Sequence, residues 1–145
     1  MTEKTFGNEN YIPSMKLSGV CDSLGVTGKY FRNGACAVEC QVSDDHLNAG
    51  GVAHGGLHST MLDSALGGAL VSIINKEEWC ATAQLDISFL NAAKVGDNLI
   101  AEGKVLRRGR NLAHCEGILS NQDGKVIATA KGTWAIWSSK PSSMN

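Results

Sequence analysis

The sequence predicts an α+β domain in which an antiparallel β-sheet is wrapped around one long helix. Between residues 57 and 74, apolar side chains recur at helical spacing around most of the circumference, so something must surround and bury this helix. Four segments with strand patterns, at residues 81–89, 97–106, 112–120 and 126–136, follow it and are joined by short turns. This order of elements favours an antiparallel sheet packed against the helix.

Length and charge limit what the chain can be. Its 145 residues fit a single domain spanning residues 1–145, and 13 Lys and Arg against 14 Asp and Glu leave a net charge of −1. A near-neutral chain has no basic field for phosphates, which argues against nucleic acid as a partner. The five cysteines are odd in number and irregularly spaced, so a disulfide scaffold is not expected.

No apolar segment has the pattern of a leader or of a membrane span. The N-terminal residues lack an apolar core, and the longest apolar stretch is interrupted by Asp63 and by hydroxyl side chains. We therefore expect a cytoplasmic protein with no membrane partner. Residues 1–12 and 138–145 are polar, which predicts flexible ends.

Two further elements are predicted before the long helix. Pro13 can open a short helix that runs to about Leu24, where Gly25 supplies a stop. From Cys36 to Val42, apolar residues alternate with others, which indicates a half-buried strand.

Two features of the long helix could carry chemistry. Asp63 lies among apolar residues, where a carboxylate is costly without partners; it is either an edge residue facing water or a subunit interface, or a general base or nucleophile. The run GGVAHGG at residues 50–56 leads into the helix, whose first backbone N–H groups can hold an anion or a developing oxyanion. The glycine patterns of nucleotide-binding loops are absent from the sequence.

Metal and serine chemistry are not favoured. His54 and His58 stand four residues apart, but Gly55 occupies the position where a zinc-binding helix motif has Glu, so no metal site is expected. Ser59 lacks the strained glycine-flanked turn of a serine nucleophile. The arginines of the turn at residues 107–111 form either a solvated turn or a clamp for phosphate groups.

The spacing Asn48-x5-His54-Gly55-Gly56-x6-Asp63, followed by TAQLDISFLNAAKVGD, VLRRGRNLA and DGKVIATAKGTW, resembles the hotdog-fold thioesterases. The resemblance is to the PaaI-like, phenylacetate-pathway branch of the 4-hydroxybenzoyl-CoA thioesterase superfamily, and it covers residues 47–136. It implies the hotdog fold, a sheet wrapped around the long helix. It also implies a homodimer that assembles into a homotetramer, with each active site at a dimer interface and built from both chains.

The resemblance implies roles for individual residues. Asp63 would act as general base on water or as nucleophile, and the Gly55 backbone N–H would polarise the thioester carbonyl. Asn48 and His54 would orient the thioester or the leaving group, and Thr82 would position the attacking water. Strict alternation turns Thr82 away from the site, so its role requires a bulge in the strand or contact with the partner chain. Substrate contacts, including those to the coenzyme A phosphates, are expected at Gly56, Leu57, Met61, Leu62, Phe89, Arg107, Arg108 and Arg110.

These features favour an acyl-CoA thioesterase that acts on an aryl- or medium-chain acyl-CoA. No metal or redox cofactor is expected, and coenzyme A enters only as part of the substrate. Two alternatives stay open: a hotdog hydratase or dehydratase, in which His54 could serve as the catalytic histidine, and a non-catalytic acyl-CoA-binding module. The residues do not identify the acyl group or decide between coenzyme A and acyl carrier protein as its carrier.

Overall fold

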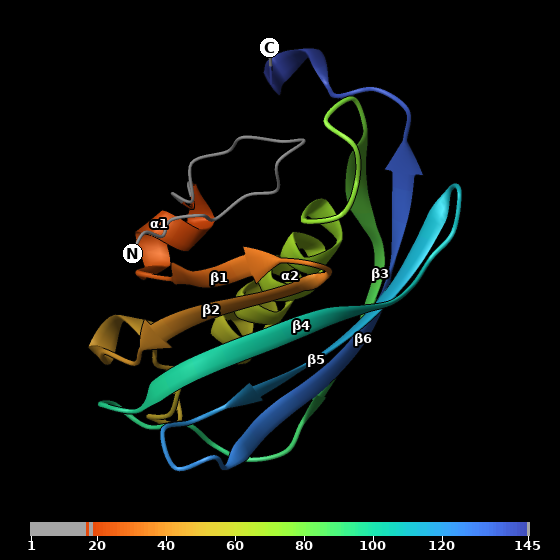
Figure 1. The fold of residues 1–145 in the computed structure, drawn as a ribbon. Coiled ribbons are helices and arrows are strands. Elements are labelled where there is room, and N and C mark those ends of the chain that lie inside the picture. Colours follow the sequence, from red (N-terminus) through yellow and green to blue (C-terminus); the bar gives the residue numbers. More distant parts are fainter. Residues whose placement is uncertain (1–16, 18, 145) are drawn as a thin grey trace.

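In a computed structural model that describes residue 17 and residues 19–144, one antiparallel sheet of six strands curves around a long helix, α2 (Figure 1). The strand order is β1-β2-β4-β5-β6-β3, so β1 and β3 form the two edges. This is the predicted hotdog arrangement. The elements are α1 (Val20–Leu24), β1 (Thr27–Arg32), β2 (Ala35–Gln41), the 3₁₀ turn η1 (Asp44–His46), α2 (Gly55–Val71), β3 (Trp79–Phe89), β4 (Asn98–Arg108), β5 (Leu112–Ser120), β6 (Val126–Trp137) and the 3₁₀ turn η2 (Ser142–Met144).

Helix α2 begins where His54 ends an extended segment and caps the first turn. The His54 Nδ1 accepts a hydrogen bond from the Gly56 N–H at 2.7 Å, which satisfies one of the N–H groups that a helix start leaves unpaired. The helix ends at Val71, three residues before the predicted end. There the Ser72 hydroxyl donates to the Ala69 carbonyl and accepts the Gly34 N–H, so this end is tied to the start of β2.

The apolar helix is buried as its sequence requires. It contacts every strand of the sheet, and its inward side chains are fully shielded from solvent. Burial of each large apolar side chain contributes roughly 1.5–3 kcal/mol relative to leaving it exposed. The fully buried set is Met61, Leu62, Ala65, Leu66, Ala69 and Leu70.

A pair of glycines lets the sheet approach α2 closely. Gly103 of β4 and Gly117 of β5 are cross-strand partners at the middle of the sheet. A Cβ added at Gly103 would lie 2.7 Å from the backbone of Ala65, and one added at Gly117 would collide with the Leu66 side chain. These two positions therefore set the distance between helix and sheet.

The structure differs from the predicted elements in three places. Strand β1 was not expected, because Phe31 is its one buried residue and the register shift between Gly28 and Tyr30 breaks the alternation that would mark a strand. The short helix ends at Leu24 before a left-handed Gly25, as predicted, but begins only at Val20, and Pro13 lies outside the described residues. Of the ends predicted to be flexible, residues 1–12 also lie outside this range, and residues 142–144 form η2.

Two other expectations concern the whole chain. All five cysteines are free and buried, which confirms that no disulfide scaffold holds this fold. Among the described helices, none is long and apolar enough to cross a membrane.

Substituting Gly103→Ala should destabilise the protein by about 1–3 kcal/mol, because the new methyl group is forced against the backbone of α2. Urea unfolding measures this change. Lys104→Ala, at the neighbouring outward-facing position, is the control and should change stability by no more than about 0.5 kcal/mol. Equal effects of the two substitutions would contradict the close approach at Gly103.

Candidate active site

Asn48 organises the loop that leads into α2. Its side-chain Oδ1 accepts hydrogen bonds from the N–H groups of Gly50, at 2.8 Å, and Val52, at 3.3 Å. Gly51 has a φ of 84°, a left-handed conformation that favours glycine, and donates its N–H to the Asn48 carbonyl. Asn48 therefore holds the loop in shape, while its contact with substrate stays a prediction.

His46, which belongs to none of the motifs found in the sequence, connects this loop to the end of α1. Its Nδ1 accepts the Ser43 N–H at 2.9 Å, so the proton of the neutral ring lies on Nε2, 2.7 Å from the Leu24 carbonyl. Its backbone carbonyl accepts the His54 N–H at 2.7 Å. The spacing from Ser43 to His46 is that of a capping box, and this was the signal in the sequence that could have revealed the anchor.

The Gly55 N–H is the free donor at the helix start. The Gly56 N–H is taken by the His54 ring and the Leu57 N–H by the His54 carbonyl, whereas no described group accepts from Gly55. The Phe89 ring, 56% exposed, stands beside this donor. A Cβ at Gly55 would lie 3.1 Å from Phe89 Cε1, so a side chain at this position would require the Phe89 ring to shift. The Gly55 N–H is available to a carbonyl oxygen that reaches the helix start.

Asp63 and Thr82 form the second half of the candidate site. The Thr82 hydroxyl donates a hydrogen bond to Asp63 Oδ1 at 2.7 Å, joining β3 to a half-buried carboxylate on α2. The pairing of β3 with β6 shifts register between Thr82 and Gln84, and this irregularity is the bulge that the role of Thr82 required. The carboxylate is therefore oriented by a hydroxyl whose own lone pairs can still accept from water.

The two halves do not meet within one chain. Gly55 and Asp63 are eight residues apart on a continuous helix, which separates them by about 12 Å along its axis. An Asp side chain is too short to span that distance. The Asp63 carboxylate thus cannot act on a carbonyl held by the Gly55 N–H of the same chain.

Of the apolar residues expected at the acyl group, three belong to the core. Leu57 is 3% exposed, and Met61 and Leu62 are not exposed at all, so none of them lines an open surface of this chain. Gly56 and Phe89 are exposed at the helix start. His58 is also buried here, and burial, with a contribution from the nearby His54, lowers its pKa.

A groove of about 610 Å³ lies elsewhere, on the sheet face that points away from α2. Its charged lining includes Asp86, Glu102, Lys104, Glu116 and Lys131, and it contains none of the predicted site residues. The predicted site residues therefore lie outside this groove. No group of three or more His, Cys, Asp and Glu within the described residues could hold a metal ion.

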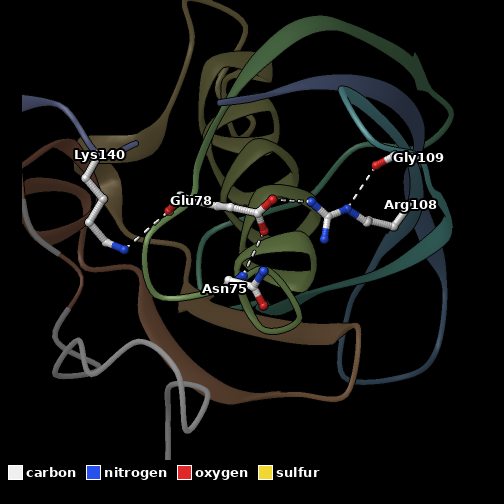
Figure 2. Close-up of polar contacts among 5 residues, drawn as sticks. All are labelled: Asn75, Glu78, Arg108, Gly109 and Lys140. Atoms are coloured by element: carbon white, nitrogen blue, oxygen red, sulfur yellow. Dashed lines mark hydrogen bonds and ion pairs between the residues drawn. The ribbon is translucent and has the colours of Figure 1, made fainter. Parts of the chain in front are cut away.

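The three arginines expected at the coenzyme A phosphates have different surroundings. Arg108 is engaged inside the chain: its Nη2 lies 2.6 Å from Glu78 Oε2, and its Nε donates to the Gly109 carbonyl (Figure 2). Glu78 also accepts the Asn75 N–H, so the turn after α2 is fastened to the β4–β5 hairpin. Arg107 and Arg110 are exposed, and phosphate binding stays a prediction for all three arginines.

The match to a known family covers this site. Residues 50–128, which include Gly55, Asp63 and Thr82, match the model of the thioesterase superfamily. Acyl-coenzyme A thioesterase 13 of Homo sapiens is 31% identical over 103 residues, covering 69% of this chain and 71% of that protein. The chain belongs to the thioesterase superfamily. It is accordingly an enzyme of the thioesterase class.

Solved structures share the fold. The PaaI protein of the E. coli phenylacetic acid degradation operon superposes with a TM-score of 0.77 at 23% identity, over 83% of this chain and 85% of its own. The smu.793 protein of Streptococcus mutans UA159, solved bound to acetyl CoA, superposes with a TM-score of 0.73 at 28% identity, over 80% of this chain and 91% of its own. Both likenesses confirm the hotdog arrangement.

The Glu78–Arg108 pair should make stability depend on acid pH. Burial acts to raise the Glu78 pKa, but the Asn75 N–H and the Arg108 guanidinium outweigh it, so the folded pKa lies below its ordinary value of 4.5. The carboxylate therefore stabilises the fold above pH 4.5, and this contribution is lost as pH falls through the folded pKa. Urea unfolding of wild type and Glu78→Gln should differ at pH 7 and converge in acid. A difference that persists unchanged in acid would contradict the pairing.

Proposed function

We propose that this enzyme hydrolyses acyl-CoA thioesters, with Asp63 and Thr82 of one chain completing a site that begins at the Gly55 N–H of another. The hydrogen bond from Thr82 to Asp63 carries the proposal, because it orients a half-buried carboxylate beside a hydroxyl that can bind water. The human relative named as an acyl-coenzyme A thioesterase and the acetyl CoA bound to smu.793 support coenzyme A as the carrier.

The chemistry follows from these groups. A water molecule held by Thr82 gives a proton to Asp63 while its oxygen adds to the thioester carbonyl carbon. Negative charge develops on the carbonyl oxygen, where the Gly55 N–H donates to it. The carbon–sulfur bond then breaks, coenzyme A leaves as the thiolate and takes up a proton, and the free acid remains. Direct attack by the Asp63 carboxylate is the alternative first step of the same reaction.

A dimer with its sheets joined edge to edge satisfies the geometry. The 12 Å separation along α2, about eight residues of helix, excludes a site made by one chain. Strand β3 carries Thr82 and is an edge of the sheet, and its last residue Phe89, like the following Leu90, is an exposed apolar side chain. Pairing of two β3 edges would bring the two helices together in opposite directions. We place the active sites at this dimer interface, and the dimers would pair again into a homotetramer.

The remaining predicted residues fit around this centre. The His54 Nδ1 accepts the Gly56 N–H, so in the neutral ring Nε2 carries a proton that can be donated to the thioester or the leaving group. Arg107 and Arg110 are exposed in or next to the β4–β5 hairpin and are free to meet coenzyme A phosphates.

Asp63→Asn should lower kcat for acyl-CoA hydrolysis by about 10²–10⁴-fold, because the base or nucleophile is removed. Thr82→Val should lower it by about 10-fold through loss of the orienting hydrogen bond. The measurement is free-thiol release from a panel of aryl- and fatty acyl-CoA substrates.

Asp123→Asn provides the matched control, since Asp123 is an exposed carboxylate in the turn between β5 and β6, away from the site and from the proposed dimer edge. It should leave kcat unchanged. Full activity in a folded Asp63→Asn protein of native oligomeric state would overturn the proposed function.

A further inference from the structure

His58 is a buried polar side chain whose hydrogen bonding the fold leaves incomplete. Its side chain is 3% exposed. Among the residues that the structure describes, its Nδ1 is the sole buried side-chain nitrogen or oxygen without a hydrogen-bond partner. A buried polar atom left unpaired costs free energy, whereas an apolar side chain of similar size would avoid that cost. The sequence keeps an imidazole where packing alone would favour leucine.

The position of His58 links this unpaired nitrogen to the helix start. His58 lies three residues after Gly55 on α2, and helical side chains lean toward the N-terminus of their helix. Its ring centroid is 6.2 Å from that of Phe89, whose ring also stands against Gly55. The Phe89 ring therefore lies beside both the first residue of α2 and the His58 imidazole, and an acyl group that reaches Gly55 would meet this ring with His58 next to it.

The chemical state of the ring decides what it can bind. Burial, and secondarily the nearby His54, lowers the pKa of His58, so the ring is neutral at pH 7. The Nδ1 of a neutral imidazole donates or accepts one hydrogen bond according to its tautomer. A hydroxyl group serves both cases, because it donates and accepts.

We propose that His58 Nδ1 hydrogen-bonds a hydroxyl group carried by the acyl chain close to the thioester carbonyl, and so selects hydroxylated acyl thioesters. The proposal rests on the proposed thioesterase function and assigns its substrate class. His58 is a specificity residue in this scheme, because it contacts the acyl chain and takes no part in the bond changes. A site built to pair with a hydroxyl discriminates strongly against the analogue that lacks it, since the buried nitrogen is then left unpaired.

The test compares coenzyme A thioesters that differ by one hydroxyl, such as 3-hydroxyoctanoyl-CoA and octanoyl-CoA. For wild type the ratio of kcat/KM values should favour the hydroxylated substrate by about 10-fold or more. His58→Leu should bring this ratio to about one, and its Tm should be no lower than that of wild type. His58→Asn, which keeps a polar atom near the Nδ1 position, should retain most of the preference.

A wild-type ratio that His58→Leu leaves unchanged, in an enzyme that hydrolyses both substrates, would overturn this proposal and leave the proposed function standing. If wild type hydrolyses neither of these two nor any member of the aryl- and fatty acyl-CoA panel, the proposed function fails, and calorimetric binding of the same pair still tests His58. Tighter binding of the hydroxylated thioester that His58→Leu abolishes supports the proposal. Equal binding by wild type and His58→Leu overturns it.

Discussion

The molecule depends on one rigid helix that carries two reactive features and keeps them apart. The free N–H of Gly55 stands at the first residue of α2, and Asp63 lies two turns further along. A helix of fixed rise cannot bend to bring them together. Chemistry that needs both an oxyanion donor and a carboxylate at one carbonyl would therefore need a second copy of the helix, which is why the proposed site is shared between two chains.

Contacts from the sheet and from the segments before and after α2 hold this helix in position. The sheet can close over α2 because Gly103 and Gly117 bring no side chains to the contact. His46 anchors the loop before the helix, and Glu78 with Arg108 anchors the turn after it. The β3 bulge then aims Thr82 at Asp63. Each anchor acts on the orientation of groups that a reacting thioester would meet, and misplacement of such groups is costly in rate.

The sequence predicts features that follow from a local repeating pattern better than features that depend on contacts between distant residues. The all-round apolar pattern of α2 predicts a surrounded helix, and strand β5 falls at its predicted bounds of Leu112 and Ser120, because neither depends on distant partners. Strand β1 is hidden by its own register shift. Arg108 pairs with Glu78 through a contact between distant segments, which no local sequence pattern predicts. The unpaired nitrogen of His58 reflects the absence of such a contact and is equally invisible in the sequence. The spacing from Asn48 to Asp63 predicts the candidate residues, but the separation of Gly55 from Asp63 becomes plain only when both are placed on one straight helix.

Mixing two inactive variants tests the shared site most directly. Gly55→Pro removes the N–H donor at the first position of the helix, where proline is accommodated, and Asp63→Asn removes the carboxylate. Unfolded and refolded together in equal amounts, the two should recover about a quarter of wild-type activity, since half of the dimers are mixed and each holds one intact site. No recovery, with mixed dimers demonstrated by mass spectrometry, would show that each site is built within a single chain.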